Sequence, residues 1–266
     1  MADKEEKEEK EGKEGKEEKK EEKLTREDYV FLSKLYEKAE RYPDMLQAIK
    51  EMIKINPKLN KEECDILSTG YKTMITDKRS SLRILQSMER REKKNKSKIV
   101  PHIKEIKSHI EKEIKNVCND LQELVDKYLI QNADSHENEV CFYKLKADYN
   151  RYICEFAEGK EYEECLNKSE EFYKKAYNIS VKDLPVNNCT RVGLALNYAI
   201  FLYETKGDKK TAFELAKKTF DESMKFVDEL EKPKCRDTLM IIQLLKENLI
   251  FWSSEMNNDE DNKLSE

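Results

Sequence analysis

The sequence is poor in the two residues that interrupt helices. Only six of its 266 residues are glycine and five are proline, and two of the glycines lie within the first 23 residues. No segment shows the alternation of apolar and polar residues that predicts a half-buried strand. Apolar residues recur instead at intervals of three and four, which is typical of helices that pack on one side. These patterns predict an all-α fold.

Long apolar runs and paired cysteines are also missing. No window approaches the ~20 apolar residues that a membrane-spanning helix needs. The seven cysteines are an odd number, none stands in a CxxC pair, and the N-terminal segment has no apolar stretch of the kind found in signal peptides. We therefore expect reduced thiols in a cytoplasmic protein, with the nucleus as a second compartment, and no membrane partner.

Charge is abundant and is concentrated at both ends. Charged residues make up 40% of the chain, against roughly 25% in an ordinary globular domain. Residues 1–23 carry a net charge of −3 and residues 253–266 a net charge of −4, and we expect two disordered tails there, one rich in Lys and Glu and one acidic. The domain between them, residues 24–252, carries +2 and shows no basic run, which argues against nucleic acid as a partner.

The positions of glycine and proline, together with the spacing of apolar residues, divide this domain into about nine helices. Thr25 and Asn60 are expected N-caps, and Pro101 suits the first turn of a helix. Short connections imply that successive helices are antiparallel neighbours. A degenerate helical solenoid is the alternative, although no constant repeat of about 34 residues is visible. The expected helices cover residues 25–40, 42–56, 60–91, 99–130, 135–157, 161–180, 188–205, 209–227 and 235–252.

Two of these helices carry an asparagine within an apolar stripe. The stripes consist of Leu196, Asn197, Ile200 and Glu204 in "RVGLALNYAIFLYE" and of Ile241, Leu244, Asn248 and Phe251 in "IIQLLKENLIFW". Two such stripes facing each other would form the wall of a groove. An amide both donates and accepts hydrogen bonds, so it can hold the backbone of an extended peptide. The alternative is that both asparagines are core residues satisfied by neighbouring backbone.

A second pattern consists of cations on two helices. They are Lys72, Arg79 and Arg83 in "GYKTMITDKRSSLR" and Arg151, which precedes Tyr152 in "KADYNRYICE". Converging from two helices, they would bind one phosphate dianion, because the guanidinium fork matches phosphate oxygens and the phenol can donate. Carboxylates such as Asp148 or Glu155 should brace the cations. The alternative is that each cation is a solvated surface charge.

In these segments the chain resembles the 14-3-3 family. Segments that resemble family motifs follow in the family's order across residues 24–252: "AERYPDM", "LSTGYK…RSSLR", "VCNDLQELVDKYLI", "YKLKADYNRY", "RVGLALNYAIFLYE", "AFELAKKTFDES" and "IIQLLKENLIFW". The resemblance implies nine antiparallel helices with a concave amphipathic groove. It implies a regulatory adaptor in signal transduction that binds phosphoserine or phosphothreonine segments of client proteins, without enzymatic activity, cofactor or metal. It also implies a homodimer, or a heterodimer with paralogues, formed through the first four helices.

The resemblance further implies roles for individual residues. It places phosphate binding at Lys72, Arg79, Arg151 and Tyr152. It places peptide binding at the amides Asn197 and Asn248, at the apolar wall Leu196, Ile200, Leu244 and Phe251, and at Glu204 and Trp252, which would lie upstream of the phosphorylated residue. It places the dimer interface at Leu35, Ala39, Arg41, Asp44, His109 and Glu113, with Arg41 opposite Glu113 and Asp44 opposite His109.

The chain departs from the family pattern at several positions. Phe251 and Leu82 stand where the family usually has leucine and tryptophan, and His109 and Ile106 replace a lysine and a tyrosine of the dimer interface. The second functional interpretation is an α-helical scaffold that binds unphosphorylated peptides or helices, and dependence on phosphate separates the two. The three histidines show no catalytic or metal-ligand spacing, so an enzyme is the least favoured class.

Overall fold

The computed structural model describes residues 23–226 and 236–264, with side chains described as far as Asn257. Within these ranges every regular element is a helix and no strand occurs, which confirms the all-α prediction. None of the helices in the described ranges is long and apolar enough to pass through a bilayer.

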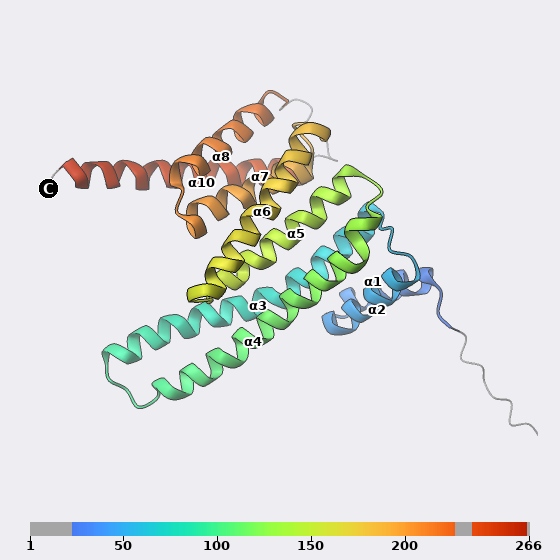
Figure 1. The fold of residues 1–266 in the computed structure, drawn as a ribbon, viewed down its shortest axis with the longest axis horizontal. Coiled ribbons are helices and arrows are strands. Elements are labelled where there is room, and N and C mark those ends of the chain that lie inside the picture. Colours follow the sequence, from blue (N-terminus) through green and yellow to red (C-terminus); the bar gives the residue numbers. More distant parts are fainter. Residues whose placement is uncertain (1–22, 227–235, 265–266) are drawn as a thin grey trace, which may run out of the picture.

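Successive helices pack as hairpins along the chain (Figure 1). The pairs are α1 (Arg26–Lys38) with α2 (Tyr42–Ile55), α3 (Lys61–Lys94) with α4 (Val100–Leu124), and α5 (His136–Cys154) with α6 (Gly159–Asp183). The remaining helices contact one another beside α5 and α6: α7 (Cys189–Ile200), α8 (Lys209–Met224) and α10 (Arg236–Leu264). In Figure 1 the long α3–α4 hairpin projects past the α5–α6 pair.

Two helices change their winding before they end. α4 continues through a π-helical turn, η1 (Val125–Leu129), and a short 3₁₀ turn, η2 (Ile130–Asn132). α7 continues through a second π-helical turn, η3 (Phe201–Lys206), which ends at Gly207. Gly207 has φ 78°, a left-handed conformation that glycine adopts without steric cost. Turns of π-helix are rare and often occur at functional sites.

Local signals set the starts of the helices. The Thr25 side chain accepts from the backbone of Asp28, and the Asp28 carboxylate accepts from the backbone of Thr25, which forms a capping box. Asn60 and Glu63 form the same motif at α3. Each helix expected from the sequence is present in the described residues, and most ends are shifted by only a few residues.

The last helix is the exception, because it runs past its expected end at residue 252. α10 continues to Leu264, whereas the acidic tail was expected to begin at residue 253. The Tyr203 hydroxyl donates to a carboxylate oxygen of Glu255 at 2.7 Å, which ties the turn after Trp252 to η3. A count of charges could not find this contact, because its two residues lie 52 positions apart. The N-terminal tail, apart from Lys23, lies outside the described residues.

Two hydrophobic clusters form the core, and α5 belongs to both. The first cluster joins α2, α3, α4 and α5 and includes Phe142. The second joins α5 to α6, α7, η3, α8 and α10 and includes Val140 and Ala147. Burial of each large apolar side chain contributes about 1.5–3 kcal/mol. Because α5 is packed on two sides, the polar side chains that it carries are held in place.

Candidate functional site

A cavity of about 280 Å³ opens between α3, α5, α7 and α10. We call it the Asn197 cavity. It brings together four of the predicted site residues, Lys72, Tyr152, Leu196 and Asn197. The other lining residues are Ser68, Cys141, Lys144, Leu145, Asp148, Tyr149, Gly193 and Ile241. Residues more than a hundred positions apart thus line one space.

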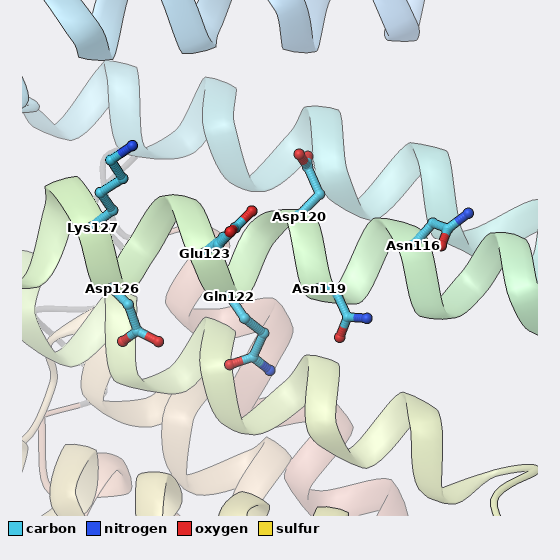
Figure 2. Close-up of a pocket in the computed structure, with 7 residues that line it drawn as sticks. All are labelled: Asn116, Asn119, Asp120, Gln122, Glu123, Asp126 and Lys127. Carbon is cyan, nitrogen blue, oxygen red and sulfur yellow. The ribbon is translucent and has the colours of Figure 1, made fainter.

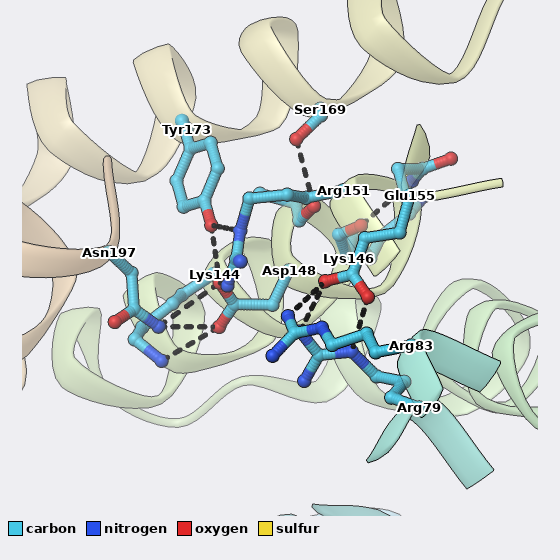
Figure 3. A network of polar contacts seen from close by, with 12 residues as sticks. Arg79, Arg83, Lys144, Lys146, Asp148, Arg151, Glu155, Ser169, Tyr173 and Asn197 are labelled. Atoms are coloured by element: carbon cyan, nitrogen blue, oxygen red, sulfur yellow. Dashed lines mark hydrogen bonds and ion pairs between the residues drawn. The ribbon is translucent and has the colours of Figure 1, made fainter. Parts of the chain in front are cut away.

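A buried carboxylate organises this site (Figure 3). Asp148 accepts hydrogen bonds from Lys144 at 2.9 Å and from Arg151 at 3.1 Å. It also accepts from the Tyr173 hydroxyl and from the side-chain amide of Asn197, whose nitrogen lies 3.0 and 3.1 Å from the two carboxylate oxygens. One residue of α5 therefore fixes side chains on α5, α6 and α7.

The charges around Asp148 stabilise one another. Burial acts to raise the pKa of Asp148, but Lys144 and Arg151 outweigh burial and lower this pKa to about 2. Burial likewise opposes the charged form of Lys144, yet Asp148 raises the pKa of Lys144 above its usual value. The pKa of Arg151 is also raised despite burial, through Tyr173 and Asp148. All three groups are therefore ionised at neutral pH.

Two arginines flank a single aromatic ring. The guanidinium carbon of Arg79 lies 3.8 Å from the ring centroid of Tyr152, and that of Arg151 lies 4.8 Å from it. Both distances are in the range of cation–π attraction. Burial, followed by Asp148, raises the pKa of the Tyr152 hydroxyl, so the phenol stays protonated and able to donate. Cations from α3 and α5 thus meet at one aromatic ring.

A second carboxylate holds the cations of α3. Glu155 accepts two hydrogen bonds from Arg79, one from Nε at 3.2 Å and a shorter one from a terminal nitrogen of the same guanidinium group. Glu155 also accepts a hydrogen bond from Arg83 at 3.0 Å (Figure 3). With Asp148 on Arg151, this confirms that carboxylates brace the cations. Lys72 differs, because it is exposed and forms no ion pair with any carboxylate of the described residues.

A second cavity of about 290 Å³, the Glu204 cavity, lies beside the first. It contains two predicted site residues, Arg151 and Glu204, and is further lined by Arg83, Gln86, Cys154, Glu155, Tyr162 and Thr205. Arg151 lines this cavity while its neighbour Tyr152 lines the Asn197 cavity. Arg151 and Tyr152 therefore stand where the two cavities meet, and Arg79 lies against the Tyr152 ring without lining either cavity.

The predicted apolar wall is only partly within these cavities. Ile241 of α10 lines the Asn197 cavity. Leu244, Asn248 and Phe251 follow it at helical spacing on the same face. Leu244 is 48% and Phe251 59% exposed, so this face of α10 extends the apolar wall outward. Ile200 instead packs against the second core cluster, partly buried.

Trp252 occupies a different place from the one expected. Its ring stacks on Tyr203, with the centroids 4.4 Å apart and the planes 9° from parallel. Only 2% of its surface is exposed, which leaves almost nothing for a peptide to touch. Trp252 therefore belongs to the core that holds α10, and we do not include it in the site that we propose. Glu204, its expected companion, is exposed.

The residues assigned to a dimer interface lie at the surface. Leu35, Ala39, Arg41, His109 and Glu113 are exposed, and Asp44 is partly exposed. Within this chain Arg41 pairs with Asp44 at 2.5 Å, and Glu113 pairs with Lys78. The pairs of Arg41 with Glu113 and of Asp44 with His109, expected across two subunits, stay predictions.

Three residues of the site were not found from the sequence. Lys144 stands one turn before Asp148, a spacing that could have indicated an ion pair. Tyr173 has no such signal, because it lies on another helix. Tyr149 lines the Asn197 cavity, and its buried hydroxyl has no hydrogen-bond partner among the described residues.

A depression of about 720 Å³ elsewhere is not a stronger candidate (Figure 2). Its lining comes from α4 and η1 alone: Asn116, Asn119, Asp120, Gln122, Glu123, Asp126 and Lys127. Asp120 is paired with Lys50 and Asp126 with Lys146, both at 2.6 Å. No predicted site residue reaches it. Among the described residues no group of His, Cys, Asp or Glu is arranged to hold a metal ion.

Comparison with known proteins identifies relatives of this chain. The family model described as 14-3-3 protein matches residues 32–253. The 14-3-3-like protein GF14 epsilon of Arabidopsis thaliana is 38% identical over 90% of this chain and 94% of its own length. The checkpoint signal transducer rad25 of Schizosaccharomyces pombe is 39% identical over 87% of this chain and 86% of its own. The 14-3-3 protein epsilon of Drosophila melanogaster is 38% identical over 88% of this chain and 90% of its own length.

Proposed function

Because this chain belongs to the 14-3-3 family, we propose that it is a regulatory adaptor that binds phosphoserine or phosphothreonine segments of client proteins. Family membership supports the adaptor role. The phosphorylated residue would bind where the Asn197 and Glu204 cavities meet, and the flanking peptide would occupy both. The adaptor carries out no reaction on its client and uses no cofactor.

The observation that carries this proposal is the convergence of cations around Tyr152. Arg79 is far from Tyr152 in the sequence and Arg151 directly precedes it, yet both guanidinium groups contact the Tyr152 ring. Lys72 lines the same cavity as Tyr152. A phosphate at this point would accept charge-assisted hydrogen bonds, each contributing about 1.5–3 kcal/mol. Because Asp148 and Glu155 already hold the arginines, little side-chain ordering remains to oppose binding.

The peptide backbone would be held mainly by Asn197. Its amide nitrogen is engaged by Asp148, so its carbonyl oxygen is the group left to accept an N–H from the peptide. Leu196 and Ile241 supply apolar surface beside it. Contacts of this kind bind an extended segment without selecting its side chains, which suits an adaptor with several clients.

We further propose that the protein acts as a dimer in the cytoplasm or nucleus. Large apolar side chains remain exposed on α1, α3 and α4, among them Phe31, Leu35, Ile84 and Ile106. Exposed apolar surface of this extent favours burial against another protein surface. Two grooves in one dimer would let a client with two phosphorylated segments bind more tightly. The cysteines within the described residues are free thiols, as in a reducing compartment.

Calorimetric titration with a phosphopeptide and its unphosphorylated twin tests the phosphate site. Wild type should prefer the phosphorylated form. Lys72→Glu should lower phosphopeptide affinity at least ~100-fold, about 2.7 kcal/mol, with little change in melting temperature, because Lys72 is exposed. Lys218→Glu, an equal charge reversal at an exposed position of α8, is the matched control. If wild type does not distinguish the two peptides, the scaffold interpretation replaces this one.

A second variant separates backbone binding from phosphate binding. Asn197→Ala should weaken the phosphorylated and the unphosphorylated peptide by a similar factor, because Asn197 would hold the backbone that both peptides share. A selective loss of phosphopeptide affinity would instead assign Asn197 to the phosphate site.

A further inference from the structure

The cationic face of α3 continues beyond the proposed phosphate site. Lys72, Arg79 and Arg83 share one face of this helix. At 3.6 residues per turn, Arg90 lies five turns after Lys72, and Lys94 lies about one turn further on, so both stand on this face. The cations therefore form a line that leads from the Asn197 cavity to the end of the α3–α4 hairpin.

The end of this hairpin is strongly basic. Residues 90–98 read RREKKNKSK and hold a single carboxylate, Glu92. The prediction that the domain has no basic run is therefore wrong for this segment. The net charge of the whole domain concealed it, because acidic residues on other helices balance these cations in the count.

Most cations at the hairpin end have no carboxylate partner among the described residues, although Arg90 donates from Nε to the backbone carbonyl of Gln86 at 3.4 Å. Arg91 pairs with Glu92 at 3.0 Å, and Lys93 pairs with Glu89 at 2.7 Å. Five exposed cations form no ion pair with any carboxylate of the described residues, and we call them the tip cations: Arg90, Lys94, Lys96, Lys98 and Lys104. Unpaired cations gathered in one place attract an anionic ligand, since no carboxylate has to be displaced.

A cavity of about 660 Å³ connects the phosphate site with this end of the hairpin. Glu155, which holds Arg79 and Arg83, lines it, and so do Lys93 and Lys104. Its other charged lining residues include carboxylates as well as lysines: Glu89, Lys107, Glu111, Lys115, Glu158 and Glu161. Because carboxylates balance the lysines of this cavity, it does not favour an anion, whereas the tip cations, of which Lys104 lines the cavity, do.

We propose that the tip cations bind an acidic stretch of the same client whose phosphorylated residue occupies the groove. This inference rests on the proposed function and extends it. Arg90 and Lys94 lie about 16 and 22 Å along α3 from Arg79, at 1.5 Å per residue. An extended peptide covers about 3.3 Å per residue. The acidic residues should therefore stand about five to seven positions from the phosphorylated residue.

The continuity of the cationic line favours a peptide over other anions. Residues 86–104 contain no Phe, Tyr or Trp, so they offer none of the stacking surfaces that single-stranded nucleic acids use. Two large apolar side chains are exposed beside the basic run, Met88 at 37% and Ile99 at 48%. A lipid surface would contact the hairpin end alone, whereas a client peptide would also use Lys72, Arg79 and Arg83 on the same face.

Three phosphoserine peptides test the proposal with the full chain. One carries glutamates five to seven positions before the phosphoserine, one carries them at the same distance after it, and one carries glutamines at both places. Exposed ion pairs each contribute modestly to affinity, so glutamates on the side that runs toward the hairpin should raise affinity about three- to tenfold. The gain should shrink at high salt, because exposed charges are screened. An equal gain from both sides would overturn the proposal.

Two matched variants locate the effect. Arg90→Gln/Lys94→Gln should lose the gain from glutamates and keep wild-type affinity for the glutamine peptide. Lys217→Gln/Lys218→Gln removes the same charge from exposed positions of α8 and should keep the gain. A gain that survives in the first variant would contradict the assignment to the tip cations.

Two further outcomes are decisive. If wild type fails to bind even the glutamine phosphopeptide, the proposed function fails and this inference fails with it. Vesicles of phosphatidylcholine with about 30% phosphatidylserine test the lipid alternative, because juxtaposed basic residues each contribute about 1 kcal/mol at such a surface. Vesicle binding that Arg90→Gln/Lys94→Gln abolishes, without any gain from acidic peptides, would replace the client peptide with a membrane.

Discussion

Asn197 on α7 donates its side-chain amide to both carboxylate oxygens of Asp148 on α5, at 3.0 and 3.1 Å. The asparagine within the apolar stripe is therefore satisfied by a carboxylate rather than by neighbouring backbone. This contact joins the helix that carries the apolar wall to the helix that carries Arg151 and Tyr152. The contact adds a polar link to the apolar packing of these two helices.

Asn197→Asp should make stability depend on pH. The new carboxylate would lie about 3 Å from that of Asp148, and like charges at this distance raise the pKa of one of the two groups. A carboxyl group whose pKa is higher in the folded than in the unfolded protein destabilises the fold at pH values above the folded-state pKa. This loss of stability disappears as pH falls through that pKa toward the unfolded-state value. We expect a melting temperature well below wild type at pH 7 and a smaller difference at pH 5. Asn197→Ala is the control, since its difference from wild type should not vary over this range.

Asp148→Asn should lose stability that wild type keeps at neutral pH and gives up only in acid. The native pKa of Asp148 is about 2, lowered from 3.8. The carboxylate therefore contributes stability that is complete above about pH 4 and is lost as pH falls toward 2. Because Lys144 and Arg151 would lose their partner, we expect the variant to be less stable by about 2–4 kcal/mol at pH 7. Urea unfolding at pH 7, 4 and 3 measures the difference. A difference that stays constant would contradict this account, and the exposed Asp221→Asn on α8 is the control.

Tyr203→Phe should loosen the end of α10 without unfolding the domain. The substitution removes the hydroxyl that donates to Glu255 and keeps the ring that stacks on Trp252. A single hydrogen bond to a charged group contributes about 1.5–3 kcal/mol when buried and less at the surface. Hydrogen exchange should therefore accelerate at the amides that follow Trp252, while those of α5 keep their protection. Unchanged exchange there would show that the Glu255 contact does not hold the helix end.

Leu35→Glu should shift the proposed dimer toward monomer. Leu35 is 48% exposed in the single chain, and a charge placed in an apolar interface has to be desolvated without a partner. Sedimentation velocity over a range of protein concentrations measures the change. Ile250→Glu, at a position of α10 that is 63% exposed, should leave the association constant unaltered. If both variants associate like wild type, α1 does not take part in the interface.

Much of the fold could be predicted from residues close together in the chain. Apolar spacing placed the helices, and capping residues such as Thr25 and Asn60 placed the starts of two of them. These signals suffice because a helix is held by hydrogen bonds and side-chain contacts that span only one turn. The shared faces of Lys72 with Arg79 and of Leu196 with Asn197 follow from the same short-range geometry.

The arrangement of the site could not be read in this way. The contacts that form it join residues far apart, as Glu155 does with Arg79 over 76 positions, Asn197 with Asp148 over 49 and Tyr203 with Glu255 over 52. The same reason explains why the burial of Trp252 and the extent of α10 could not be predicted from the sequence. Whether a cation is braced or free, and whether an aromatic ring is buried or exposed, depends on which helix packs beside it. The packing of the helices against one another is set by burial of both hydrophobic clusters together. No single segment of the sequence determines it.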